Sequence, residues 1–201
     1  MSAVVQTVDE IPYLTEREPA PGRLALVQRF VNTVDYEHGR EVLSEPARLR
    51  RLLVELGLLS PDDVVSEADF GRALAVREAL RALALANNGA AVDPEQLAVL
   101  ERAAADGRLT VRFDAVGFDG GRGTVLVPTA SGVRGALADL VGIVYTAMAD
   151  GTWPRLKACK RDVCRWLFYD RSRNRSARWC QMAVCGNRTK TRAYRTRRRT
   201  V

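Results

Sequence analysis

The chain contains 201 residues, 47% of them hydrophobic, and its formal net charge is +7. This composition excludes wholesale disorder, because enough apolar side chains are present to form a buried core. The N-terminal stretch lacks the basic start and apolar centre of a signal peptide, and no run of about 18 apolar residues predicts a membrane-spanning helix. We therefore expect a cytoplasmic protein without a membrane partner, folded as one large or two small domains.

The charges are divided between two parts of the sequence. Residues 1–154 carry 15 Lys and Arg against 22 Asp and Glu, which gives a net charge of −7. Residues 155–201 carry 16 Lys and Arg, and their only acidic residues are Asp162 and Asp170, which gives a net charge of +14. This division indicates an acidic globular part followed by a basic part that binds a polyanion.

Residues 1–22 are polar and contain several prolines, which predicts a flexible leader. From Leu24 onward, apolar residues recur at helical spacing, and prolines, glycines and capping residues mark where helices begin and end. The stretch after the first helix contains the only histidine, His38, and is expected to be a loop. The expected helices span residues 24–34, 46–57, 66–86 and 94–106.

The pattern then changes from helical to alternating. Residues 109–113 and 124–127 are rich in β-forming residues and predict one β-hairpin. The glycine-rich stretch between them superficially resembles a phosphate-binding loop, but it lacks the Gly-Lys-Ser/Thr motif and does not join a strand to a helix, which favours a turn. Residues 131–150 predict one more helix, and residues 152–154 form a short joint to the basic part.

All four cysteines lie in the basic part, in two pairs that are each separated by four residues: Cys159 with Cys164, and Cys180 with Cys185. In a reducing compartment, clustered cysteines are more often metal ligands than disulfides. Four thiolates form a closed tetrahedral site of the structural zinc type, and zinc supplies folding energy that so small a module lacks. Two disulfides, an iron–sulfur cluster and redox-active thiols stay open as alternatives.

Between the cysteine pairs, residues 165–169 predict a short aromatic strand and residues 178–180 a return strand. After Cys185, Gly186 permits a tight backbone path around the metal, and residues 187–199 are expected to form a basic helix. The aromatic residues of this part either form a miniature core or stack on bases: Trp166, Phe168, Tyr169, Trp179 and Tyr194. The core is favoured, and Tyr194 is the best candidate for an exposed contact.

A short motif, Cys185-Gly186-Asn187-Arg188, follows the second pair and is supported by Trp179-Cys180-Gln181-Met182, by Phe168-x-Asp170-x-Ser172 and by Lys190. With these residues, the segment 156–199 resembles the CGNR zinc finger family, and the resemblance also implies zinc ligation by the four cysteines. Members typically carry an N-terminal helical domain called ABATE. Residues 24–150 are similar to it in the Asn32-Thr33 pair, in the order of elements and in length.

We therefore predict a mostly α protein. Its parts are a flexible leader over 1–22, an ABATE-like helical domain with one β-hairpin over 23–152, and a small treble-clef-like zinc finger with a basic C-terminal helix or tail over 153–201. The members of the family are described as stress-induced transcriptional regulators of bacteria. The resemblance implies the same function for this chain. The sequence contains no coiled-coil heptad, so it does not predict an oligomeric state.

The predicted function is that of a DNA-binding transcriptional regulator and not of an enzyme, because no paired catalytic groups surround His38 and four thiolates leave zinc without an open position. An RNA-binding or protein-interaction module stabilised by zinc is the alternative. Arg188 could instead be structural and pair with Asp170. Phosphate contacts are assigned to the cations of the CGNR motif and the residues after it: Arg188, Lys190, Arg192, Arg195, Arg197, Arg198 and Arg199.

Asn32, Thr33 and His38 are the candidate residues for a pocket that binds a small-molecule effector in the helical domain. The simpler interpretation is that Asn32 and Thr33 end the first helix or support a loop, and that His38 lies on the surface or caps a turn.

Overall fold

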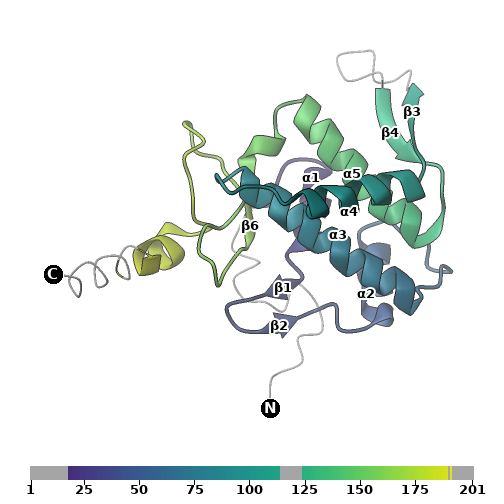
Figure 1. Ribbon diagram of the computed structural model, residues 1–201, viewed down its shortest axis with the longest axis horizontal. Helices are drawn as coiled ribbons and strands as arrows, with labels where there is room; N and C mark the ends of the chain where they lie inside the picture. Colours follow the sequence, from purple (N-terminus) through teal and green to yellow (C-terminus); the bar gives the residue numbers. More distant parts are fainter. Residues whose placement is uncertain (1–17, 114–123, 190, 192–201) are drawn as a thin grey trace.

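The computed structural model describes residues 18–113, 124–189 and 191. Helices form most of it and surround one core (Figure 1), which confirms the predicted mostly α fold. The predicted leader lies almost wholly outside the described residues. The helices are α1 (Leu24–Val31), α2 (Pro46–Glu55), α3 (Glu67–Ala86), α4 (Pro94–Asp106) and α5 (Gly132–Ala149).

The N-terminus of α3 shows why the helix boundaries were predictable from sequence. Ser66 Oγ accepts a hydrogen bond from the Asp69 backbone N–H at 3.1 Å, and the Asp69 carboxylate accepts one from the Ser66 backbone N–H at 3.2 Å. These reciprocal bonds satisfy two N–H groups that a helix leaves unpaired at its start. Pro46 and Pro94 open α2 and α4 at positions where a missing N–H costs nothing.

Helix α5 lies in the middle of the core, against α1, α4 and strand β4 (Thr124–Pro128). Its small residues permit close contacts, since a Cβ at Gly135 would collide with the Ala130 carbonyl. Within the part of the chain that the structure describes, α5 is the one helix long and apolar enough to cross a membrane by length and composition. Because 56% of its 18-residue window is buried inside the protein, it has the burial of a core helix.

Strand β4 pairs antiparallel with β3 (Leu109–Phe113), in a register that places Leu109 opposite Pro128 and Phe113 opposite Thr124. This is the predicted hairpin, and its glycine-rich connection lies outside the described residues. A second, shorter pair joins β1 (Val34–Asp35) to β2 (Arg40–Glu41), where the sequence predicted only a loop. Strands of two residues are too short to show alternation, so periodicity could not reveal them.

The basic part begins with a 3-10 turn over Trp153–Arg155, followed by β5 (Leu156–Ala158) and β6 (Leu167–Tyr169), which pair antiparallel. The predicted return strand over 178–180 is wrong, because β6 pairs with β5 instead. The Arg178 carbonyl accepts hydrogen bonds from the Lys160 backbone N–H and from the Asn88 side chain, so it is not part of a strand ladder.

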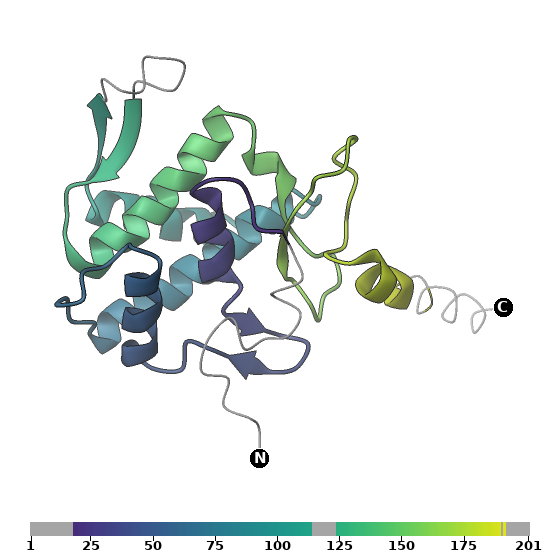
Figure 2. The ribbon, with the colours of Figure 1, turned by 180° about the vertical axis from the view of Figure 1, so that it is seen from behind.

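The apolar core continues from the helices into the basic part. Trp153, Leu156, Trp166 and Leu167 are buried in the same cluster as Phe30 of α1. Figures 1 and 2 show the basic part at one end of the molecule and the β3–β4 hairpin at the other. The division into domains at residues 152/153 stays a prediction.

Candidate metal centre

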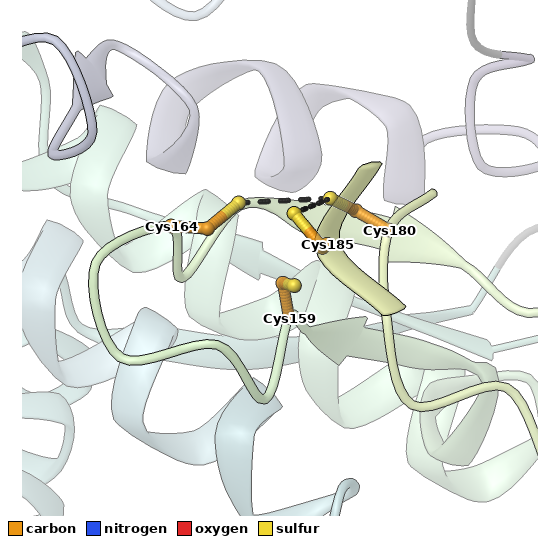
Figure 3. A group of neighbouring side chains, drawn as sticks. All are labelled: Cys159, Cys164, Cys180 and Cys185. Atoms are coloured by element: carbon orange, nitrogen blue, oxygen red, sulfur yellow. Dashed lines mark hydrogen bonds between the residues drawn. The ribbon is translucent and has the colours of Figure 1, made fainter. Parts of the chain in front are cut away.

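The four cysteines converge on one point (Figure 3), and all four Sγ atoms lie within 4.8 Å of one another. Cys164 Sγ and Cys185 Sγ are each 3.6 Å from Cys180 Sγ. Thiolates held tetrahedrally at about 2.3 Å from a zinc ion are about 3.8 Å apart, so these donors fit one zinc ion. The predicted cofactor is confirmed: this is a zinc-binding site.

The geometry also decides between zinc and disulfides. All four cysteines are free, and separations of 3.6 Å are far longer than the bond of about 2.05 Å in a disulfide. Cys159 and Cys185 are buried, with 0% and 2% of their surfaces exposed. Cys180 is partly buried, and four largely buried thiol donors fit the structural type of zinc site, in which no position is left for water or substrate.

The first cysteine pair is shaped by the turn between β5 and β6. The Cys159 backbone N–H donates to the Trp166 carbonyl at 2.9 Å, and the Cys164 N–H donates to the Arg161 carbonyl at 2.8 Å. Arg165 closes this turn in the left-handed region, with φ of 49°. The turn is a zinc knuckle that points both thiols to the same side.

In the second pair, Cys180 precedes a single π-helical turn over Met182–Gly186 and Cys185 lies within it, and residues 187–189 continue as a helix. The Cys185 N–H donates to the Gln181 carbonyl at 2.9 Å. A Cβ on Gly186 would meet the thioether of Met182, a flexible and exposed side chain that can move aside. A knuckle followed by a helix that begins at the second pair agrees with the predicted treble-clef-like arrangement.

Hydrogen bonds among the four thiols shift their pKa values in opposite directions. Hydrogen bonds from Cys164 and Cys180 lower the pKa of the Cys159 thiol to about 7. Hydrogen bonds from Cys159 and the other thiols lower the pKa of Cys185, with a contribution from Arg161. Hydrogen bonding to the same neighbours raises the pKa of Cys164. The lowered values favour the thiolate form that zinc binds.

Most aromatic side chains near the two cysteine pairs in sequence are buried or partly buried. Trp166 and Phe168 are buried, and Trp179 packs against the core, which fits the interpretation of a miniature core. The Trp179 indole N–H is buried and has no hydrogen-bond partner among the described residues. Tyr194 lies outside the described residues.

Asparagine side chains of the helical part hold the backbone of the basic part. The Asn32 amide donates to the Leu167 carbonyl at 2.9 Å and accepts from the Leu167 N–H at 2.8 Å. Asn87 donates to the Trp153 and Leu156 carbonyls, at the C-terminal end of α3. Such bonds replace strand pairing and hold the zinc module against the helices.

Comparison with protein families gives two matches that together span most of the chain. Residues 24–151 match the ABATE family, described as "Putative stress-induced transcription regulator", and residues 155–198 match the CGNR zinc finger. The chain belongs to the ABATE family. A search of the curated proteins found no match. The predicted family is confirmed, and we call residues 24–151 the ABATE region and residues 155–198 the CGNR finger.

The ABATE region contributes one carboxylate to the surface of the CGNR finger. Glu37, between β1 and β2, bonds to Arg161 at 2.7 Å and also to Arg188 of the CGNR motif. Arg188 therefore does not pair with Asp170, whose partner is Lys157 at 2.7 Å. The remaining predicted phosphate contacts lie outside the described residues: Lys190, Arg192, Arg195, Arg197, Arg198 and Arg199.

The three residues predicted to form an effector pocket lie in different surroundings. Asn32 and Thr33 are buried; the Asn32 amide is bonded to Leu167, and Thr33 Oγ1 donates to the Phe30 carbonyl at 3.0 Å. His38 Nδ1 lies 2.8 Å from the Asp35 carboxylate. Of the three, His38 alone lines a cavity of about 210 Å³ between the β1–β2 hairpin and the CGNR finger.

Proposed function

We propose that the protein is a DNA-binding regulator of transcription whose CGNR finger binds the phosphate backbone of duplex DNA. The observation that carries the proposal is the division of charge, with −7 over residues 1–154 and +14 over residues 155–201. A module of this size that concentrates so many cations against two acids attracts polyanions strongly. The membership of a family of transcription regulators favours DNA among the polyanions.

In this proposal zinc is structural. The ion, held by Cys159, Cys164, Cys180 and Cys185, would fix the knuckle relative to the helix that begins at residue 187. Zinc bound by thiolates supplies folding energy and takes no part in chemistry. The phosphate contacts proposed for the finger are Arg188 and the cations that follow it in the sequence: Lys190, Arg192, Arg195, Arg197, Arg198 and Arg199.

Regulation belongs to the ABATE region in this proposal. A small molecule in the cavity beside His38 would touch Arg188 and Glu37 at the same time, because all three line it. Such a ligand would alter the contact between the ABATE region and the CGNR finger. We place the protein in the cytoplasm, where regulators of transcription act in bacteria.

The salt dependence of binding tests the proposal. Labelled duplex DNA should bind the zinc-loaded protein, and the affinity should fall steeply as salt rises, because each neutralised phosphate adds about 0.9 to the slope of log K against log salt. Chelation of zinc by EDTA, or Cys185→Ser, should abolish binding. Binding that ignores salt and metal would contradict the proposal, and single-stranded RNA that displaces the duplex at lower concentration would favour an RNA-binding module.

A further inference from the structure

The segment between the two cysteine pairs carries cations that contribute to the net charge of the basic part and that have no role in the proposed function. We call residues 171–178 the arginine loop; its sequence is RSRNRSAR. Arg171 is engaged within the protein, because it bonds to Glu18 at 2.6 Å and lies over the Tyr169 ring. The other arginines of the arginine loop are Arg173, Arg175 and Arg178, and all are exposed.

The backbone of the arginine loop is fixed by a buried lysine. Lys157 Nζ donates to the Asp170 carboxylate at 2.7 Å and to the carbonyls of Arg175 and Ala177 at 2.5 and 3.2 Å. The Asp170 carboxylate in turn accepts from the Ala177 N–H at 3.0 Å. Burial opposes ionisation of Asp170, yet the hydrogen bonds from Lys157 and Ser172 outweigh it and lower its pKa.

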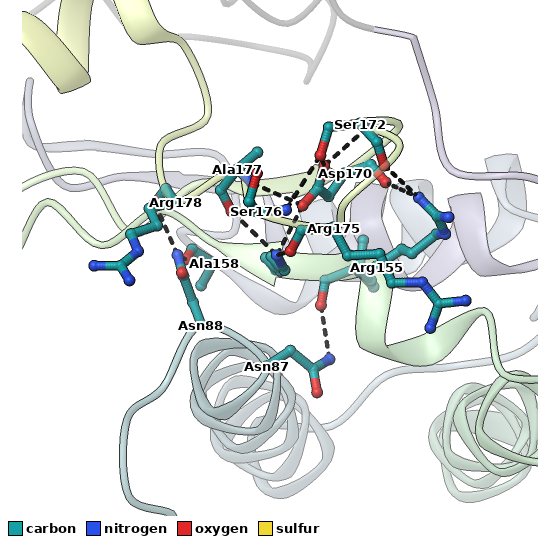
Figure 4. A network of polar contacts seen from close by, with 12 residues as sticks. Asn87, Asn88, Arg155, Ala158, Asp170, Ser172, Arg175, Ser176, Ala177 and Arg178 are labelled. Carbon is teal, nitrogen blue, oxygen red and sulfur yellow. Dashed lines mark hydrogen bonds and ion pairs between the residues drawn. The ribbon is translucent and has the colours of Figure 1, made fainter.

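Both ends of the arginine loop are held as well. Arg155 donates to the carbonyls of Asp170 and Ser172 at 2.8 and 3.0 Å. Asn88 of the ABATE region donates to the Arg178 carbonyl at 2.8 Å. These bonds use backbone carbonyls, so they define the course of the loop and leave its guanidinium groups unused (Figure 4).

Arg173, Arg175 and Arg178 lie in a stretch of the sequence that is poor in acidic residues. Asp170 is the only acid from residue 163 to the end of the chain, and it is buried and paired with Lys157. Among the described residues, no ion pair or side-chain hydrogen bond engages Arg173, Arg175 or Arg178. Figure 4 shows the Arg178 guanidinium extending away from the network. Lys160 is next to this surface, since its N–H donates to the Arg178 carbonyl at 2.9 Å.

We propose that the arginine loop is a second phosphate-binding surface of the CGNR finger, which contacts the backbone of duplex DNA through Arg173, Arg175 and Arg178. The inference rests on the proposed function and extends it to residues outside the C-terminal helix. Guanidinium groups bind phosphate oxygens in pairs, and a loop whose backbone is already ordered loses little entropy on binding. The loop and the helix from residue 187 lie at the same end of the molecule, away from the β3–β4 hairpin (Figures 1 and 2).

The test compares two triple variants that remove equal charge. R173Q/R175Q/R178Q removes the cations of the arginine loop and keeps the backbone bonds that hold it. R51Q/R102Q/R112Q removes exposed arginines of the ABATE region and serves as the control. Both should keep one zinc per chain and the wild-type melting temperature, since no buried group changes.

Binding of a labelled duplex is measured for both variants and for the wild-type protein across a series of salt concentrations. The loop variant should show a slope of log K against log salt smaller by about 2 to 3, and its affinity at about 0.1 M salt should be lower by roughly fivefold or more for each arginine that no longer binds a phosphate. The control should keep most of the wild-type slope.

Failure of this inference and failure of the proposed function give different results. If the wild-type protein binds the duplex and the loop variant keeps its slope, the arginine loop is not a phosphate-binding surface. An equal loss of slope in the control overturns the inference too, because overall charge would then explain both. If the wild-type protein itself does not bind duplex DNA, the proposed function falls and this inference falls with it.

Discussion

Cations of the CGNR finger that have protein partners differ in role from those that face solvent. Lys157 is buried with Asp170, and Arg161 bonds to Glu37 of the ABATE region. These partnered cations hold the finger in shape and against the helices. The solvent-facing cations have no side-chain partner among the described residues and are free to contact phosphate: Lys160, Arg165, Arg173, Arg175 and Arg178. The cations of the CGNR finger thus form both a scaffold and a binding surface, and substitutions can test the two roles separately.

Loss of zinc should disrupt both sets of cations at once and have the largest effect. Cys159→Ser removes a buried donor from the cluster, so the CGNR finger should lose its zinc and most of its structure. Zinc content and the fluorescence of Trp166 and Trp179 measure the change, and α3 should keep its helical signal in circular dichroism. A variant that retains zinc and wild-type fluorescence would contradict the assignment of Cys159 as a ligand.

Breaking the buried pair should destabilise the scaffold. Lys157→Met leaves the Asp170 carboxylate buried without its cation and removes the bonds to two loop carbonyls. We expect the free energy of unfolding to fall by about 3 to 5 kcal/mol in urea titrations. Lys160→Met is the control, because this exposed lysine has no such partners, and its unfolding should match that of the wild-type protein.

The contact between the ABATE region and the CGNR finger can be tested at Asn32. Asn32→Ala leaves the buried Leu167 N–H without a partner, while the Leu167 carbonyl keeps only the bond from Gln28 at 3.3 Å; this should cost about 1 to 3 kcal/mol of unfolding free energy. Limited proteolysis should then cut near residues 152–154 faster than in the wild-type protein. Asn187→Ala changes an exposed amide and should leave both measurements unaltered. Equal effects in the two variants would contradict the claim that Asn32 holds the CGNR finger against the ABATE region.

The exposed bond between Glu37 and Arg188 offers a smaller test. Glu37→Gln frees Arg188 for phosphate, so affinity for duplex DNA should rise by about two- to fivefold at low salt, the range of an exposed ion pair. Glu101→Gln makes the same change of charge at an exposed position of α4, and it measures the effect of net charge alone. If both variants gain affinity equally, the bond does not restrain Arg188.

The smallest effect is expected at the start of α3. Burial raises the pKa of Asp69, but hydrogen bonds from Ser66 and the charge of Arg72 outweigh it and leave the pKa below the ordinary value. The stabilisation is therefore complete above about pH 4 and is lost as pH falls through the lowered folded-state pKa. Asp69→Asn should cost about 0.5 to 1 kcal/mol at pH 7, and the difference from wild type should shrink toward pH 3.

Features with a local sequence signature were predicted well. Capping residues and helical periodicity placed α2, α3 and α4, alternation placed β3 and β4, and spacing placed the four cysteines together. Each of these signals comes from bonds between residues that are close in sequence, or from chemistry that a few residue types alone can provide. The CGNR motif added the family.

Features that depend on distant partners escaped prediction. Asn32 was expected to end the first helix or support a loop, with an effector pocket as the other candidate; it does end α1, but its partner Leu167, 135 residues away, could not be predicted. The prediction of a return strand at 178–180 was wrong. The Arg178 carbonyl instead accepts hydrogen bonds from the Asn88 side chain and the Lys160 backbone N–H. The arginine loop was seen as charge alone, since nothing in RSRNRSAR indicates that Lys157 fixes its backbone. Such contacts follow only once the helices and the CGNR finger are packed together.

The most direct test of the two sets of cations is the reactivity of individual arginines, mapped by mass spectrometry after treatment with an arginine-specific reagent. With duplex DNA bound, Arg173, Arg175 and Arg178 should become protected, while Arg51 and Arg112 of the ABATE region stay as reactive as in the free protein. Unchanged reactivity of the arginine loop, or protection of Arg51 and Arg112 in its place, would contradict the account.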